Sequence, residues 1–299
     1  MQTEEEYRQE WLEGKHNTDY NNCRFTEDKY KFAIDWLMKS QPNTSLDQPQ
    51  NIVDIICKQK IDLITDEQYC NKCQAWADKA KVQSLLYNMG LQDITIPTKI
   101  LVPVNNQITE DDVINLVNSV DTQNVIIKCN HGSGWNITIN KAVSINYKYI
   151  TEKLNEWLQL NYAYISGYEK QYEKMTPIVI AQPLLIDKPL DYSFWCVDGN
   201  IEAIGLTKKF GKNFEEYFAF TDENGKQLPW YIGMKPEWAN IPKSFMNNIE
   251  RMKPIVKSLA AGFKFVRVDL YFINGNIYFG ELTFTPCSGI LELNEAINC

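Results

Sequence analysis

The sequence has few histidines and no long apolar run. His16 and His131 are the only histidines, too few for a histidine-rich metal site. No apolar stretch approaches the roughly 20 residues needed to span a bilayer, and the acidic start, MQTEEEYRQEW, lacks the apolar core of a signal peptide. The net charge of −8 argues against a broad nucleic-acid surface. We therefore expect a cytoplasmic protein that does not span a membrane and does not bind nucleic acid.

Two common nucleotide-binding motifs and a disulfide framework are also missing. The segment Asn124–Asn140, NVIIKCNHGSGWNITIN, has neither GKS nor GKT and leads into an expected strand, which excludes a P-loop. No GxGxxG precedes a helix, which excludes the Rossmann fingerprint. Eight irregularly spaced cysteines fit reduced thiols better than disulfides. Cys70 and Cys73 form a CxxC without a partner pair, so two half-buried thiols on one helix are favoured over a metal site.

The stretch richest in chemistry is Phe265–Gly289, FVRVDLYFINGNIYFGELTFTPCSG. Two runs of aromatic and β-branched residues flank Asn274–Asn276, which predicts a β-hairpin. A two-residue turn would place Asp269 opposite Gly280 and send the side chains of Asp269 and Glu281 to opposite faces of the sheet.

A three-residue loop gives a different register, and we prefer it. With Gly275 or Asn276 in the left-handed conformation of a bulged turn, the two acidic residues face each other and Arg267 faces Thr283. One face then carries all four polar side chains. The opposite face carries residues that are suited to a core: Val266, Val268, Leu270, Leu282 and Phe284.

Paired carboxylates predict a bound cation. Two carboxylates with Cβ atoms about 5 Å apart repel each other unless a cation lies between them. Mg²⁺ is the expected ion, because it prefers hard oxygen ligands and is often held by one or two carboxylates together with substrate phosphates. An exposed sheet face with ordinary charges is the alternative, but the neighbouring Arg267 favours a functional site.

Two further segments fit a nucleotide. Alternation along the strand before the glycines places Ile126 and Lys128 on one side, and glycines let backbone N–H groups approach an anion. The segment Pro177–Ile186, PIVIAQPLLI, predicts an apolar strand interrupted by Pro183, at an edge or irregular position. Adenine needs such a hinge, with free backbone groups and apolar walls. A new strand begins at Asp191.

These segments carry a resemblance to a known family. Residues 266–269 (VRVD) and 280–286 (GELTFTP) resemble the metal-binding end of ATP-grasp enzymes, and more closely that of the TupA-like ATP-grasp family, which is associated with teichuronopeptide and other surface polysaccharides. Residues 128–136 (KCNHGSGWN) and the run from Asp78-Lys79 to Ile96-Pro97 are also similar to that family. The resemblance covers roughly residues 78–289, with its motifs in the family order.

The resemblance implies an α+β ATP-grasp fold with antiparallel or mixed sheets and helices. We expect a mainly helical N-terminal region over residues 1–98, a lid subdomain with the glycine-rich hairpin over 99–187, and a base subdomain with the metal site over 188–299.

The resemblance also implies ATP and Mg²⁺ as cofactors. The implied cofactor-binding residues are Lys128, Gly132, Ser133, Gly134, Gln182, Leu185, Asp191 and Lys208. Lys128 would contact the α- or β-phosphate, Gln182 to Leu185 would line the adenine hinge, and Asp191 would accept the ribose hydroxyls.

Several roles stay open at this point. Asp187 competes with Asp191 for the ribose. Lys208 and Lys209 either contact phosphate or end a solvated strand. Lys79 either approaches the phosphates or substrate, or is a solvated lysine in the first turn of a helix. His131 is either a substrate-side general base or a loop histidine oriented by hydrogen bonds.

By the same resemblance, Asp269, Glu281 and Thr283 are the expected metal ligands, and Arg267 and Lys128 the expected catalytic residues. Arg267 would stabilise the transferring phosphoryl group. The implied activity is ATP-dependent ligation of a small-molecule or glycan-linked carboxylate, such as a uronic acid, to an amine, through an acyl phosphate. The alternatives are a phosphotransferase on the same fold and a non-catalytic nucleotide binder. No oligomeric state is predicted.

Overall fold

The computed structural model describes residues 27–185, 191–210, 215–233, 245–291 and 293–295, with the backbone alone for 40, 206–210, 215–219, 233 and 294–295. Contacts divide the chain into two compact units. The first unit consists of residues 1–44, 60–86 and 96–185, and the second of residues 45–59, 87–95 and 186–299. Segments of the N-terminal region belong to both units, so the division into three consecutive subdomains stays a prediction.

The described part of the N-terminal region is mainly helical, as predicted. Its helices are α2 (Lys29–Ser40), α3 (Ile52–Thr65), α4 (Glu67–Ala77) and α5 (Val82–Asn88), followed by the short η2 (Gln92–Ile94). Asp28 and Asp66 cap α2 and α4 by accepting hydrogen bonds from backbone N–H groups of the first turn. Cys70 and Cys73 are both buried on α4, which agrees with the structural interpretation of the CxxC.

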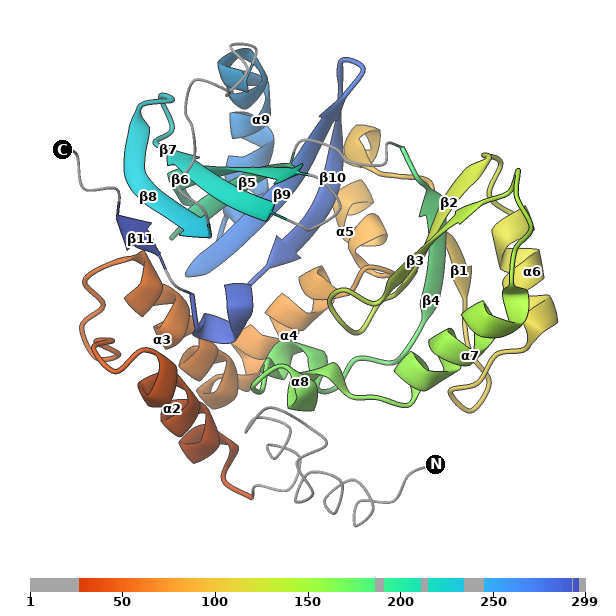
Figure 1. The fold of residues 1–299 in the computed structure, drawn as a ribbon. Coiled ribbons are helices and arrows are strands. Elements are labelled where there is room, and N and C mark those ends of the chain that lie inside the picture. The colour runs from red at the N-terminus through yellow and green to blue at the C-terminus, as the bar shows by residue number, and fades with distance from the viewer. Residues whose placement is uncertain (1–26, 186–190, 211–214, 234–244, 292, 296–299) are drawn as a thin grey trace. The chain divides into compact units, whose positions relative to one another are not determined.

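The first unit contains a four-stranded antiparallel sheet with the strand order β1-β4-β2-β3 (Figure 1). The strands are β1 (Lys99–Leu101), β2 (Asn124–Cys129), β3 (Asn136–Asn140) and β4 (Val179–Pro183). Pro183 is the last residue of β4, where its missing N–H costs little. The short elements α8 (Tyr162–Ile165) and η3 (Lys170–Tyr172) precede β4.

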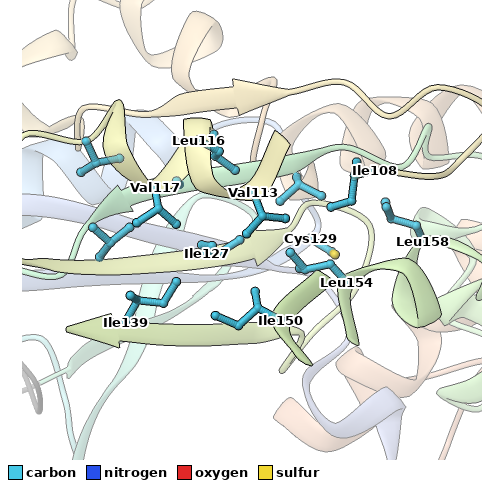
Figure 2. Close-up of a cluster of buried hydrophobic side chains, with 14 residues drawn as sticks. Ile108, Val113, Leu116, Val117, Ile127, Cys129, Ile139, Ile150, Leu154 and Leu158 are labelled. Carbon is cyan, nitrogen blue, oxygen red and sulfur yellow. The ribbon is translucent and has the colours of Figure 1, made fainter. Parts of the chain in front are cut away.

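One face of this sheet is covered by α6 (Glu110–Asn118) and α7 (Tyr147–Leu158). Figure 2 shows the apolar core between these helices and the strands. Val125, Ile127 and Cys129 point into it from β2, and all three are fully buried. The intervening residues Ile126 and Lys128 therefore lie on the opposite face, as the alternation predicts.

The second unit is built on a seven-stranded antiparallel sheet with the order β10-β9-β5-β6-β7-β8-β11 (Figure 1). Its elements are β5 (Asp191–Val197), β6 (Asn200–Phe210), β7 (Glu215–Thr221), β8 (Gln227–Gly233), α9 (Phe245–Ala260), β9 (Phe265–Ile273), β10 (Asn276–Thr283), η5 (Pro286–Gly289) and β11 (Asn294–Glu295). The predicted α+β class with antiparallel sheets is confirmed. The residues expected on the apolar face of β9 and β10 are all buried: Val266, Val268, Leu270, Leu282 and Phe284.

The β9–β10 hairpin has the predicted register, but the predicted loop was wrong. Asp269 pairs with Glu281 and Arg267 pairs with Thr283. The turn has two residues, Asn274 and Gly275, and both have positive φ, at 51° and 86°. This is the backbone that an Asn-Gly hairpin turn favours. The register instead comes from a β-bulge between Phe279 and Glu281.

Within the described residues, no helix is long and apolar enough to cross a membrane.

Candidate functional site

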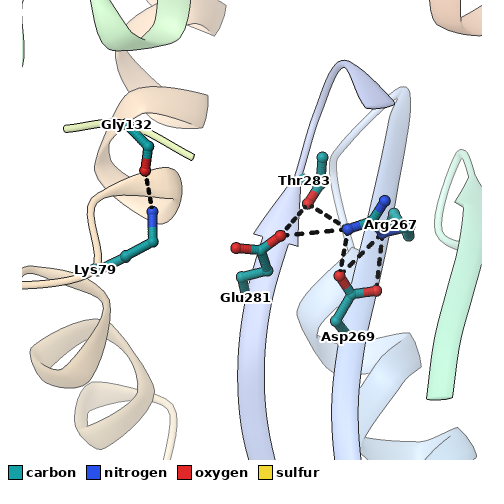
Figure 3. Close-up of polar contacts among 6 residues, drawn as sticks. All are labelled: Lys79, Gly132, Arg267, Asp269, Glu281 and Thr283. Atoms are coloured by element: carbon teal, nitrogen blue, oxygen red, sulfur yellow. Dashed lines mark hydrogen bonds and ion pairs between the residues drawn. The ribbon is translucent and has the colours of Figure 1, made fainter. Parts of the chain in front are cut away.

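Four polar side chains meet on one face of the β9–β10 hairpin (Figure 3). The Nε atom of Arg267 donates to both carboxylate oxygens of Asp269, at 2.9 and 3.0 Å, and Nη2 donates to Oδ2 at 2.5 Å. The same Nη2 lies 3.3 Å from Oε1 of Glu281 and 3.1 Å from Oγ1 of Thr283. Thr283 in turn donates to Oε1 of Glu281 at 2.9 Å. The cation between the paired carboxylates is thus the guanidinium.

Burial and charge shift the ionisation of this cluster. The side chains of Asp269 and Arg267 are 10% and 19% exposed, whereas that of Glu281 is 41% exposed. Burial raises the pKa of Asp269; Arg267 opposes this and Glu281 adds to it. Burial lowers the pKa of Arg267, but its attraction to Asp269 and Glu281 more than offsets this and leaves the pKa raised. The guanidinium therefore stays charged, and Glu281 is the carboxylate most open to solvent.

Sequence reasoning missed two residues of this face, Ser193 and Tyr271. Ser193 on β5 pairs with Asp269, and its hydrogen bond lowers the pKa of that carboxyl. Tyr271 follows Asp269 by two positions on β9; burial, then Asp191, Asp269 and Glu281, raise the pKa of its phenol. The alternation of side chains that placed Arg267 and Asp269 on one face also places Tyr271 there. The two-residue repeat of the strand could therefore have predicted the position of Tyr271.

The predicted ribose-binding residue Asp191 lies on the same face of the second unit. Asp191 is the first residue of β5 and pairs with Tyr271, while Ser193, the next residue on that face, pairs with Asp269. Asp191 and Asp269 are therefore diagonal neighbours, a separation of about 7 Å in an antiparallel sheet. Of the other predicted residues in this unit, Asp187 lies outside the described residues, and only the backbone of Lys208 and Lys209 is described, in β6.

The hairpin offers a small set of oxygen atoms that could serve as ligands of a metal ion. Across the described ranges, no group of three or more His, Cys, Asp and Glu side chains gathers where it can hold a metal ion. What converges at the hairpin is two carboxylates and one hydroxyl, all in contact with a cationic group. These hard oxygen atoms already contact a positive charge, the guanidinium of Arg267. They are also of the kind that holds Mg²⁺, which is commonly bound by one or two carboxylates together with water and phosphate.

In the first unit, the glycine-rich loop joins β2 to β3. Gly132 is buried, and a Cβ atom there would lie 2.5 Å from the ring of Trp135. Gly134 has a φ of +73°, a conformation that favours glycine. Ser133 between them is exposed, and Lys128 is half-buried on the face opposite the helices. Gly134 is therefore favoured by the backbone conformation of the loop, and Gly132 by the closeness of the Trp135 ring.

Asn130 anchors this loop from a fully buried position. Its side-chain amide donates to Oδ1 of Asp78 at 2.9 Å and to the carbonyl of Thr176 at 3.0 Å. Its side-chain oxygen accepts a hydrogen bond from the backbone N–H of Ile178 at 2.7 Å. The amide thus ties the loop both to the segment before β4 and to the turn at Asp78.

His131 is held in the same way. Its Nδ1 lies 3.2 Å from Oδ1 of Asn130 and its Nε2 lies 3.1 Å from the carbonyl of Trp157. Burial lowers the pKa of His131, although the contact with Trp157 raises it in part. Of the two roles left open by the sequence, the oriented loop histidine agrees with this geometry, because both ring nitrogens already face protein oxygens.

Lys79 also reaches the loop. The pair Asp78-Lys79 lies in the turn that leads directly into α5, where the carbonyl of Asp78 accepts from the backbone N–H of Val82 at 2.9 Å. The Nζ atom of Lys79 donates to the carbonyl of Gly132 at 2.7 Å (Figure 3). Lys79 is thus a contact of the glycine-rich loop rather than a solvated lysine.

The predicted hinge, Gln182 to Leu185, consists of the last two residues of β4 and the two residues after it. Gln182 is only 5% exposed, and its Nε2 donates to Oγ1 of Thr98 at 2.8 Å. The backbone N–H of Leu184 donates a hydrogen bond to the carbonyl of Asn124 at 3.0 Å. Leu185 is half-buried, and its N–H donates to none of the residues that the structure describes.

Comparison with known proteins identifies the family. Residues 59–297 match the family described as TupA-like ATPgrasp. The chain belongs to this family, which confirms the ATP-grasp fold expected from the sequence. No curated protein sequence matches the chain.

Solved structures with a similar fold include D-alanine–D-alanine ligase from Bacillus anthracis complexed with ATP, at 15% identity and a TM-score of 0.41, over 71% of this chain and 55% of that one. Another is N5-carboxyaminoimidazole synthase from Aspergillus clavatus in complex with ADP and 5-aminoimidazole ribonucleotide, at 11% identity and a TM-score of 0.42, over 70% of this chain and 44% of that one. The chain thus spans about half the length of these structures.

Proposed function

We propose that this protein is an ATP-dependent ligase that joins a carboxylate to an amine through an acyl phosphate. The observation that carries the proposal is the convergence of Arg267, Asp269, Glu281 and Thr283 on one sheet face. Membership of the TupA-like ATP-grasp family supports it. Little covalent chemistry is asked of the protein, because phosphoryl transfer depends mainly on positioning and charge stabilisation.

Asp269, Glu281 and Thr283 would hold the magnesium. The bound Mg²⁺ would neutralise charge on the β- and γ-phosphate oxygens as ADP leaves. Glu281 is the more exposed carboxylate, so its oxygens are the more accessible to a ligand. Asp269 is oriented by Ser193 and Arg267, which hold its carboxylate in one direction on the sheet face.

Arg267 would stabilise the transferring phosphoryl group. Its fork is already engaged with two carboxylates, and the same planar set of donors matches phosphate oxygens better than a lysine would. When substrate phosphates compete for those donors, part of the guanidinium is released to them. We therefore assign Arg267 a catalytic role at the reacting group and Lys128 one at the nucleotide phosphates.

The first unit would bind the rest of the nucleotide. The exposed backbone at Ser133 and Gly134 would cover the phosphates. Gln182 and Leu185 would face the base, since one side-chain oxygen and one backbone N–H remain there to receive it. In the second unit, Asp191 would accept the ribose hydroxyls.

The substrate carboxylate would take the γ-phosphoryl group, and ADP would leave. The amine nitrogen would then attack the acyl carbon and lose a proton, while phosphate departs, so that the products are an amide, ADP and phosphate. We infer that the carboxylate is a uronic acid or related group of a surface-polysaccharide precursor. The family resemblance of the VRVD and GELTFTP motifs motivates this choice of substrate.

The first test is ADP release from Mg-ATP with a matrix of uronic-acid-containing carboxylates and small amines, followed by mass spectrometry of each active pair. A ligase releases ADP only when both partners are present and gives a product lighter than the two partners by one water. ADP with a phosphorylated acceptor alone would identify the phosphotransferase instead, on the same fold and with the same phosphate-facing residues.

Asp269→Asn tests the assigned residues. Turnover should fall by about 100-fold or more, because the anionic oxygen is lost where positive charge must be held. The unfolding midpoint should change little, since the asparagine still accepts from Arg267. Glu202→Gln is a matched control, because Glu202 is exposed on β6 of the same sheet. Near-normal turnover of the Asp269 variant would contradict the metal site.

A further inference from the structure

The amide of Gln182 is nearly buried and is held at one end only. The side chain is 5% exposed, and its Nε2 donates to Oγ1 of Thr98 at 2.8 Å. The other end, Oε1, accepts no hydrogen bond from any residue in the described part of the chain, and it is not sealed from solvent. An acceptor that receives no donor from the protein but is still reached by solvent is available to a donor of a ligand.

Thr98 determines which end of the amide is left over. Its hydroxyl donates its single proton to the carbonyl of Ile96, at 2.8 Å. The oxygen of that hydroxyl can then only accept from Gln182, so the group facing it must be the –NH₂. Only one orientation of the Gln182 amide is therefore compatible with Thr98, because in the other orientation Oε1 would face the hydroxyl oxygen, which is also an acceptor. Oε1 is therefore presented as an acceptor.

The surroundings of Oε1 specify the ligand that would meet it. On the sheet face away from α6 and α7, Gln182 pairs with Ile126. The next row along the strands holds Ile100, Ile180 and Lys128, and Ile100 is 54% exposed. One row is two residues, about 7 Å along a strand. An acceptor without a protein donor, beside apolar side chains and with a cation one row away, fits a flat ring that bears an N–H donor and is joined to an anionic group.

We propose that Thr98 is a specificity-determining positioning residue, which fixes the amide of Gln182 so that the site selects 6-aminopurine over 6-oxopurine nucleotides. The inference rests on the proposed nucleotide-dependent function. A 6-amino group donates to Oε1, whereas a 6-oxo group would set two acceptors against each other. Without the hydroxyl of Thr98, the terminal torsion of Gln182 has two nearly equivalent orientations, and the amide can turn its –NH₂ to the oxo group.

Titration calorimetry with Mg-ADP and Mg-IDP tests this, because these nucleotides differ at the purine 6-position and neither requires the unidentified substrates. We expect wild type to bind Mg-ADP about 10- to 100-fold more tightly than Mg-IDP, because the bound 6-oxo group would set one acceptor against another. In Thr98→Val the ratio should fall to about threefold or less, and Thr98→Ser should restore it. Thr138→Val is the matched control, because Thr138 lies on β3 in the row of Gln182 and pairs with Ile126.

The outcomes separate the inference from the function it rests on. If neither nucleotide binds to wild type, the proposed function fails, and this inference fails with it. If Mg-ADP and Mg-IDP bind equally to wild type, or if Thr98→Val keeps the full preference, the role of Thr98 is refuted while nucleotide binding stands. Should Thr98→Val not fold, Gln182→Met carries the test: it removes both ends of the amide and should abolish the preference, and a preference that survives would refute the inference.

Discussion

Gly280 lies in the bulge that sets the register of the β9–β10 hairpin, and replacing it with alanine should disturb both stability and nucleotide binding. An added Cβ atom would lie 2.8 Å from the backbone carbonyl of Asp269 and 3.2 and 3.3 Å from the ring of Tyr271. The carbonyl belongs to β9, which is paired on both sides, with β10 and with β5. The backbone must therefore shift at the residue that carries the buried carboxylate.

The expected cost follows from this overlap. Overpacking of a well-packed site typically costs about 1–3 kcal/mol, out of a total stability of about 5–15 kcal/mol. Displacement of a reacting group by about 1 Å costs on the order of 100-fold in rate. Gly280→Ala should therefore lower the free energy of unfolding by about 1–3 kcal/mol in urea titrations, and it should also weaken Mg-ADP binding in calorimetry.

Gly275→Ala separates the two effects. Gly275 has a φ of +86°, and nothing lies within 4 Å of an added Cβ atom. The substitution costs about 1–2 kcal/mol through the left-handed backbone alone, at the tip of the hairpin and away from the carboxylates. Both variants should lose stability, but only Gly280→Ala should lose nucleotide affinity. An unchanged unfolding midpoint and an unchanged Mg-ADP affinity for Gly280→Ala would refute the reasoning.

Three further substitutions have defined outcomes. Burial lowers the folded-state pKa of His131, so the wild-type protein should lose stability as the pH falls below about 6.5, at up to about 1.4 kcal/mol per pH unit. His131→Gln should reduce this dependence of the unfolding free energy on pH, measured by urea titration. The same pH dependence in both proteins would contradict a neutral buried imidazole. Asn130→Leu removes the amide that pairs with Asp78 and should cost about 3 kcal/mol in thermal unfolding, against less than about 0.5 kcal/mol for Asn124→Leu at an exposed position of β2. Arg267→Lys keeps the charge but loses the fork, so turnover should fall about 100-fold with little change in the unfolding midpoint; an equal loss of both would indicate a structural role only.

For the β9–β10 hairpin, the sequence predicted the register correctly and the loop incorrectly. The pairing of Asp269 with Glu281 followed from the demand that polar residues share a face, and that demand held. The loop was wrong because Asn274-Gly275 forms the two-residue turn that its chemistry favours, and the extra residue sits at Gly280 instead. A glycine inside a strand often marks a bulge, so the signal was present in the sequence.

The contacts of the first unit were out of reach for a different reason. Local alternation placed Lys128 correctly, because it needs only its immediate neighbours. The bonds of Asn130 to Asp78 and of Gln182 to Thr98 join positions 52 and 84 residues apart. No local pattern encodes such a pairing, since the fold creates it by bringing a turn and a strand end together.

The ion pair of Arg267 has a consequence for how mutants of this site are interpreted. The guanidinium opposes the rise of the Asp269 pKa, so deleting it would change the protonation of the neighbouring acid as well as remove a positive charge. An alanine at Arg267 would therefore report two losses at once, and its effect cannot be assigned to either residue alone. A double-mutant cycle that also includes Asp269→Asn separates the two losses. The amount by which the free-energy changes of the two single variants fail to add up in the double variant measures the interaction between Arg267 and Asp269.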